Sequence, residues 1–200
     1  MRAWETQAKL QALLADGSQR LPTMADIMTA SQQYSNPRDR VLFLLTYLTA
    51  GRVSEVVSIR AEDIQPTYHE GREVITITMP NRKHRVRHSK VIPIAMDMPQ
   101  EKALMEPVLE YAKGKTGLLL AREGRPGEGI KELRAWQIIG TAGFNPHWLR
   151  HIRLTHLETV YGLSGERLKV FAGWTDTRPA KNYMELNWGD VLNGIRGSSA

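Results

Sequence analysis

The stretch REVITITMPNRKHRVRHSKVIPI, residues 72–94, holds two apolar, β-branched runs on either side of a strongly basic segment. The first run, 72–79, alternates apolar and polar residues with a period of two, and the second, 90–94, is a partner of similar character. This pattern predicts a β-hairpin whose connecting turn carries the basic segment. The fold therefore contains an antiparallel sheet with a group of cations at one end of it.

Most of the rest of the chain has a helical pattern. The apolar run that ends at Gly51 begins with Asn36 and Pro37, which suit an N-cap and a first helical position, so a buried core helix is expected there. Further helices are predicted at 4–15, 23–32, 98–113 with an interruption at Pro107, 129–142, 146–161, 164–172, 179–186 and 188–195. The segment GLLLA near residue 118 indicates a brief third strand. The predicted class is α+β, mostly α, with a small antiparallel sheet on one side of a helical domain.

Length and composition limit the classes of protein. Two hundred residues with 42% hydrophobic content suit one domain with one core. The chain has no cysteine, which excludes disulfides, thiolate zinc sites and cysteine nucleophiles. No run approaches the roughly 20 apolar residues of a membrane span, and the amphipathic N-terminus has no signal-peptide block. We expect a cytoplasmic protein without a membrane partner.

Positive charge is concentrated in the predicted turn. Lysine plus arginine outnumber acidic residues by 27 to 21, which gives a net charge of +6. The turn region itself carries Arg82, Lys83, Arg85, Arg87 and Lys90. Such a cluster repels itself in water and favours a polyanionic partner, although an ordinary basic surface would also account for the net charge.

A second segment, NPHWLRHIRLTHL at 145–157, raises the question of a metal site because it holds three histidines. At about 100° per residue, His147 and His151 share a helix face and His156 lies towards the other, so the three cannot form one ligand set. The i, i+4 pair also lacks a third ligand and a nearby carboxylate, and Arg150 between them disfavours a cation. We therefore predict no metal here.

An anion suits the same segment better. His147 lies at a predicted helix N-terminus, where free backbone N–H groups and the helix dipole attract negative charge, and Arg150 follows one turn later with a fork that fits two phosphate oxygens. The alternative is that Arg150 pairs with Glu158 or with a neighbouring helix, and that His147 is only a surface cap. This segment alone leaves both interpretations open.

Four segments together resemble the tyrosine recombinase (phage integrase) family over about residues 20–190. TAGRVSEVVSIRAEDI resembles its first box, with Arg52 and Glu55 at the arginine and acidic positions. PHWLRHIRLTHL resembles the second box, with its active-site histidine and arginine matched by His147 and Arg150, while His151 and His156 fit non-catalytic positions.

The remaining matches to the family lie in the final box and in the hairpin. LKVFAGWTDTRPAKNYMEL resembles the final box, with Trp174 nine residues before the nucleophile position at Tyr183. The hairpin lies where the family carries a catalytic lysine, and Lys83 is the best match, with Lys90 as the alternative. Two departures are Trp174 in place of the commoner histidine and TDTRP in place of a Ser/Thr-rich turn.

The resemblance implies a role for each matched residue. Tyr183 would attack a DNA phosphodiester to give a 3′-phosphotyrosyl link, with Arg52 and Arg150 on the non-bridging oxygens. Lys83 would protonate the leaving 5′-oxygen, and His147 would bond the phosphate and accept the tyrosine proton. Trp174 would donate its indole N–H, and Glu55 would orient Arg52 or His147 from behind. Arg82, Arg85, Arg87 and Lys90 would contact DNA. No metal or other cofactor is implied.

The resemblance also implies an organisation and partners. We expect a linker or N-terminal helix at 1–20, the catalytic domain at 21–196 and a flexible tail at 197–200. The expected partner is double-stranded DNA, bound as a homotetramer that exchanges a C-terminal helix, with a monomer in the absence of DNA. Relatives usually carry a further N-terminal DNA-binding domain, so this chain would be a catalytic-domain fragment or an unusually short enzyme.

Three other functions compete with recombination. A type IB topoisomerase uses nearly the same residues but relaxes a single duplex. A DNA-binding module could keep the fold without the chemistry, although the full residue set argues against this. A metal-dependent nuclease would need a carboxylate cluster, and none is visible near the basic segments.

Overall fold

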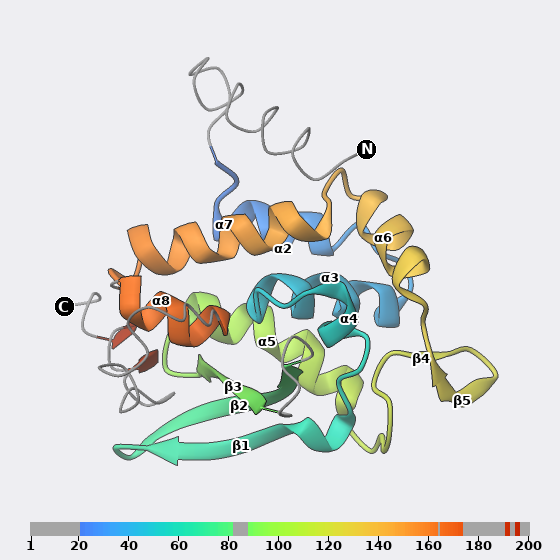
Figure 1. The fold of residues 1–200 in the computed structure, drawn as a ribbon, viewed down its shortest axis with the longest axis horizontal. Coiled ribbons are helices and arrows are strands. Elements are labelled where there is room, and N and C mark those ends of the chain that lie inside the picture. The colour runs from blue at the N-terminus through green and yellow to red at the C-terminus, as the bar shows by residue number, and fades with distance from the viewer. Residues whose placement is uncertain (1–20, 82–87, 164, 174–190, 193–194, 197–200) are drawn as a thin grey trace.

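The computed structural model describes residues 21–81, 88–163, 165–173, 191–192 and 195–196, and Figure 1 shows the helices stacked on one side of a small sheet. The helices are α2 (Met24–Ser31), α3 (Pro37–Leu48), α4 (Val53–Val56), the 3-10 helix η1 (Ala61–Asp63), α5 (Pro99–Ala112), α6 (Glu132–Gly140), α7 (Pro146–Thr159) and α8 (Gly165–Ala172). The strands are β1 (Ile64–His69), β2 (Arg72–Asn81), β3 (His88–Ala95), β4 (Ala121–Arg122) and β5 (Arg125–Gly129). The predicted α+β class, mostly α, is confirmed.

Some predicted elements lie outside the described residues. These are the helices at 4–15 and 179–186, the basic turn at 82–87, the tail at 197–200 and most of the helix at 188–195. From the last of these, Val191, Leu192 and Ile195 are described and lie in the core, each at most 1% exposed. The domain boundaries at 20 and 196 therefore remain predictions.

Helix α3 is the central core helix, as predicted. The side chain of Asn36 accepts a hydrogen bond from the backbone N–H of Arg38 at 2.9 Å, and Pro37 occupies the first turn. All its residues from Val41 to Leu48 are buried, because α5, α6 and α7 pack around it. The helix ends at Leu48, and Ala50 then takes a left-handed conformation with φ of 43°.

The three-stranded antiparallel sheet has the order β1-β2-β3, and the predicted hairpin is its β2-β3 pair. Ile77 of the central strand pairs with Ile64 on one side and Ile92 on the other. The sequence did not predict β1, because Pro66 lacks a backbone N–H and the strand's exposed face is polar. A proline is tolerated there because β1 is an edge strand.

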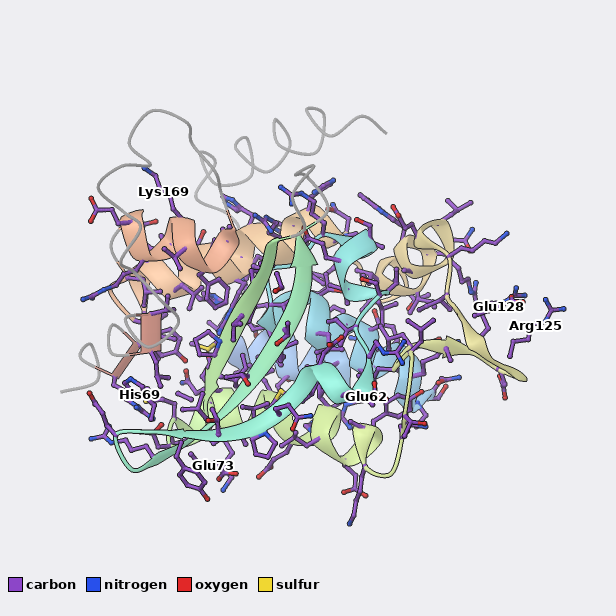
Figure 2. All side chains as sticks on the ribbon, turned by 60° about the horizontal axis from the view of Figure 1, so that its bottom comes forward. Glu62, His69, Glu73, Arg125, Glu128 and Lys169 are labelled. Atoms are coloured by element: carbon purple, nitrogen blue, oxygen red, sulfur yellow. The ribbon has the colours of Figure 1, made fainter. Side chains whose placement is uncertain are left out.

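Two details of the sequence prediction were wrong. The segment near Leu118 adds no third strand to the sheet, since Leu118 makes only an isolated bridge to Arg60. The third strand of the sheet is β1 instead. A separate hairpin, β4-β5, projects at the edge of the molecule, where Figure 2 shows Arg125 and Glu128 close together. Helix α5 is also continuous through Pro107.

No helix among the described residues is long and apolar enough to cross a membrane.

Candidate active site

Arg52 is positioned by a tight turn between α3 and α4. The backbone N–H of Gly51 donates to the hydroxyl of Thr49 at 3.0 Å, and a Cβ on Gly51 would lie 2.7 Å from that same oxygen and 2.8 Å from Val56. Only glycine fits so close a backbone approach without a shift of its neighbours. The turn places Arg52 at the N-cap position of α4, where its backbone N–H donates to Glu55 and its guanidinium, which has no acceptor atom, remains available to the site.

Glu55 is the buried carboxylate beneath Arg52. Its Oε1 accepts from the Arg52 guanidinium at 2.8 Å and its Oε2 accepts from the Arg52 backbone N–H at 3.0 Å, while Glu55 itself is 1% exposed. Burial alone would raise the pKa of Glu55, but Lys90 and Arg52 outweigh it and hold that pKa below its usual range. The carboxylate is therefore charged and contacts Arg52, which is one of the two residues that the sequence analysis gave as its partners.

Lys90 lies at the start of β3 and points into the same site. Its Nζ is 3.5 Å from Oε2 of Glu55, and its side chain is only 8% exposed. Burial lowers the pKa of Lys90 to about 8, although the Glu55 carboxylate partly offsets this. The sequence analysis placed Lys90 among the DNA contacts of the turn, whereas the structure places its ammonium against a buried carboxylate.

Arg150, on the second turn of α7, contacts the turn that carries Arg52. One of its terminal nitrogens donates to the carbonyl of Ala50, the residue with positive φ, and the other donates to the carbonyl of Ala172 at 3.1 Å. Burial and the nearby Arg52 lower the pKa of Arg150. A guanidinium remains charged even so, and two carbonyls from separate segments hold it in place. The alternative partner, Glu158, lies two turns further along the helix and is exposed.

His147 stands at the N-terminal end of α7, which Asn145 caps by accepting from the Trp148 N–H at 2.9 Å. The imidazole lies against Trp136 of α6, with ring centroids 5.4 Å apart and an angle of 69° between the rings. Partial burial, Arg150 and Arg52 lower the pKa of His147. The imidazole is therefore neutral at neutral pH and can accept a proton. Trp136 was missed by the sequence analysis, because a tryptophan in a short helix is usually a packing residue.

The structure thus brings Arg52, Glu55, Lys90, His147 and Arg150 to one place. The other predicted site residues, Lys83, Trp174 and Tyr183, lie outside the described residues, as do the DNA-contact candidates Arg82, Arg85 and Arg87. Three cationic side chains lie around one carboxylate, with which Arg52 and Lys90 form ion pairs, so the site has excess positive charge in a half-buried setting. Such a site attracts an anion, and forked guanidinium groups suit phosphate oxygens.

Two other features of the described residues were weighed as sites. No group of three or more His, Cys, Asp or Glu side chains in the described part of the chain is arranged to hold a metal ion. A surface depression of about 760 Å³ lies beside α5, lined in part by Arg40, Pro107, Leu109 and Lys113. It is wide open and includes none of the predicted site residues, so the cationic cluster is the better candidate.

The second and third histidines of the 145–157 segment are separated from the site. His156 is buried, and its Nδ1 lies 2.7 Å from the hydroxyl of Tyr47 in the core between α7 and α3. His151 is exposed on α7. Both placements agree with the non-catalytic roles that the sequence analysis expected of them.

Comparisons with known proteins identify the family and the fold of this chain. The model of the phage integrase family matches residues 20–188. The XerH site-specific recombinase, solved bound to a palindromic difH substrate in a post-cleavage complex, is similar with a TM-score of 0.53 and 17% identity, covering 88% of this chain and 50% of that one. A lambda integrase dimer bound to a COC′ core site is similar with a TM-score of 0.52 and 18% identity, covering 76% of this chain and 55% of that one.

These structural matches show the fold, which is that of a tyrosine recombinase catalytic domain, as predicted. The chain spans about half the length of the solved relatives that it matches. No curated protein sequence matches it.

Proposed function

Because the chain belongs to the phage integrase family, we propose that it cleaves and rejoins DNA through a 3′-phosphotyrosyl link to Tyr183. The family and the fold together support site-specific recombination in general. The observation that carries the proposal is the grouping of Arg52 and Arg150 beside His147 at one half-buried, positively charged site. Two guanidinium groups held by backbone carbonyls and a buried carboxylate are preorganised for a phosphate, as electrostatic catalysis requires.

In the proposed reaction the Tyr183 oxygen forms a bond to phosphorus while the bond from phosphorus to the 5′-oxygen breaks. The tyrosine proton passes to His147, which is neutral at neutral pH, and Lys83 protonates the departing 5′-oxygen. Arg52 and Arg150 neutralise the non-bridging oxygens, and Trp174 donates its indole N–H to the same phosphate. A 5′-hydroxyl from another strand then reverses the step, so the bond energy is conserved and no ATP is needed.

The proposal extends to partners and location. Both solved relatives are DNA complexes, and we propose double-stranded DNA as the partner here, with the basic residues Arg82, Arg85 and Arg87 on its backbone. The same proposal includes a homotetramer on DNA, a further DNA-binding domain like the one that relatives usually carry, and a cytoplasmic location. Binding by this chain alone should be weak and strongly salt-dependent.

A covalent-capture experiment tests the chemistry without knowledge of the target. The protein is incubated at low salt, in EDTA, with a pool of nicked suicide duplexes of random core sequence, and protein–DNA adducts are isolated on a denaturing gel and sequenced. Wild type should form adducts, Tyr183→Phe should form none, and Tyr68→Phe, at a tyrosine that is 72% exposed on β1, should match wild type. Adducts that survive in Tyr183→Phe, or none in wild type, would refute the mechanism.

Two further assays separate the competing functions. Relaxation of a supercoiled plasmid without strand exchange between captured sites would favour a topoisomerase. Tight DNA binding without any adduct would favour an inactive module. For the general acid, a 5′-bridging phosphorothiolate substrate has a leaving group that needs no proton, so it should rescue Lys83→Met.

A further inference from the structure

Lys90 occupies a position that a lysine rarely takes. It alternates in phase with Ile92 and Ile94, both fully buried, and its register partner across the sheet is the buried Met79. The β3 backbone therefore directs the Lys90 side chain to the core face and not to the solvent. An ammonium in such a place is costly unless a carboxylate compensates it, and Oε2 of Glu55 lies 3.5 Å away.

The ion pair links the sheet to the arginine of the α4 turn. Both oxygens of Glu55 are engaged: Oε1 accepts from the Arg52 side chain, and Oε2 accepts from the Arg52 backbone and faces Lys90. A carboxylate held at both oxygens cannot rotate freely, and its plane sets the direction of the Arg52 guanidinium. Removal of the Lys90 charge would leave the buried carboxylate with Arg52 as its remaining ion-pair partner, and its Oε2 would keep the Arg52 backbone N–H but lose the ammonium.

We propose that Lys90 is a positioning residue that holds the Glu55 carboxylate in the orientation that directs Arg52 at the phosphate, and that it neither contacts DNA nor protonates the leaving group. The phosphate as the target of Arg52 rests on the proposed function, whereas the ion pair between Lys90 and Glu55 is observed in the structure. To act as the acid, Lys90 would have to leave a buried glutamate, and this would leave that carboxylate with Arg52 alone.

The first test needs no DNA. The Glu55 carboxyl carbon is titrated by NMR in wild type, Lys90→Met and Lys90→Arg, with Lys102→Met, at a lysine that is 54% exposed on α5, as the control. The pKa of Glu55 should rise in Lys90→Met and stay low in Lys90→Arg and in the control. An unchanged Glu55 pKa in Lys90→Met would overturn the proposal.

The reciprocal measurement covers the case in which Lys90→Met does not fold. In Glu55→Gln, the pKa of Lys90, followed at its amine nitrogen, should fall below the value of about 8 that wild type should show, because the carboxylate no longer offsets burial. If Glu55→Gln leaves the pKa of Lys90 in place, the two groups are not coupled and the proposal fails.

The second test measures adduct formation on a captured site under single-turnover conditions. Lys90→Met should slow it by about 100-fold, as expected for a misplaced catalytic group, and Lys90→Arg should restore most of the rate. Because both substitutions act through Arg52, the double variant Lys90→Met/Glu55→Gln should be no slower than Glu55→Gln alone. Additive losses, or rescue of Lys90→Met by the phosphorothiolate, would overturn the proposal in favour of direct contact.

The two tests fail separately. A wild type that forms no adduct would refute the proposed recombination chemistry, while the NMR titrations would still decide whether Lys90 holds Glu55. A coupled pair in the titrations together with a Lys90→Met variant that cleaves at the wild-type rate would overturn the positioning role and leave recombination intact.

Discussion

Arg153 and Glu101 form a fully buried, bidentate ion pair that joins α7 to α5. Nη1 of Arg153 lies 2.5 Å from Oε1 of Glu101 and Nη2 lies 2.8 Å from Oε2, and both side chains are 0% exposed. The hydroxyl of Tyr161 donates to the same carboxylate at 2.9 Å. Desolvation would lower the pKa of Arg153, but the Glu101 carboxylate outweighs it and raises that pKa. The pair fixes α7, the helix that carries His147 and Arg150.

Substitution of Glu101 by glutamine should therefore destabilise the protein strongly. It would leave the Arg153 guanidinium buried without a countercharge, which costs about 3–5 kcal/mol. Urea unfolding measures the loss, and Glu106→Gln on the same helix is the control, because the Lys102–Glu106 pair is exposed and worth less than about 1 kcal/mol. A loss in Glu101→Gln no larger than in the control would show that the buried pair does not hold α7.

Gly51→Ala should destabilise the Arg52 turn. The new Cβ would lie under 3 Å from Thr49 and Val56, neither of which can swing away as a long side chain can, so the cost should resemble the roughly 1–3 kcal/mol of overpacking. Gly140→Ala is the matched control: it ends α6, nothing lies within 4 Å of its added Cβ, and alanine should stabilise it by up to about 1 kcal/mol. Thermal unfolding of both variants should show opposite shifts, and equal shifts would contradict the tight turn.

Trp136→Ala should raise the pKa of His147. Desolvation is the main reason that this pKa lies below 6.5, with Arg150 and Arg52 acting in the same direction. His147 is an exposed residue whose ring packs against Trp136, so loss of the indole should open that covered side of the imidazole to solvent. NMR titration of the ring proton should show the pKa moving towards 6.5 in Trp136→Ala and staying low in Trp136→Phe. Leu133→Ala, at an α6 residue that is 73% exposed, should have no effect. Identical titrations in wild type and Trp136→Ala would exclude the contact.

Local patterns were sufficient to predict the elements that carry the site. The cap at Asn36, the helix predicted from residue 146 and the alternation in β2 each depend on residues close in sequence, and all three appear in the structure. Gly51 was predicted only as the end of the core helix, and the short helix α4 that follows it was not predicted. Sequence motifs could then place Arg52 and Arg150 at one site, because the resemblance supplied the long-range contact that local patterns lack.

The partners of the charged residues could not be predicted in the same way. Glu101 and Arg153 are 52 residues apart, and no periodicity indicates that two charges will be buried together. Lys90 was assigned to the basic turn because its neighbours are cationic. The period-two phase that it shares with Ile92 and Ile94 would have placed it on the core face, and this phase was the available signal.

The burial of Lys90 should also make stability depend on pH. Its pKa falls from 10.5 in the unfolded chain to about 8 in the folded protein, so the unfolded state binds more protons between these values and stability should rise with pH there. The free energy of unfolding of wild type, relative to that of Lys90→Met, should rise by up to about 3 kcal/mol from about pH 8 to about pH 10.5. Glu55 stays charged across this window in Lys90→Met, so it adds only a constant difference. Urea unfolding of both proteins at each pH gives the difference, and Lys102→Met should follow wild type throughout. A difference that stays flat, or that falls as pH rises, would mean that the Lys90 ammonium carries no burial penalty in the folded protein.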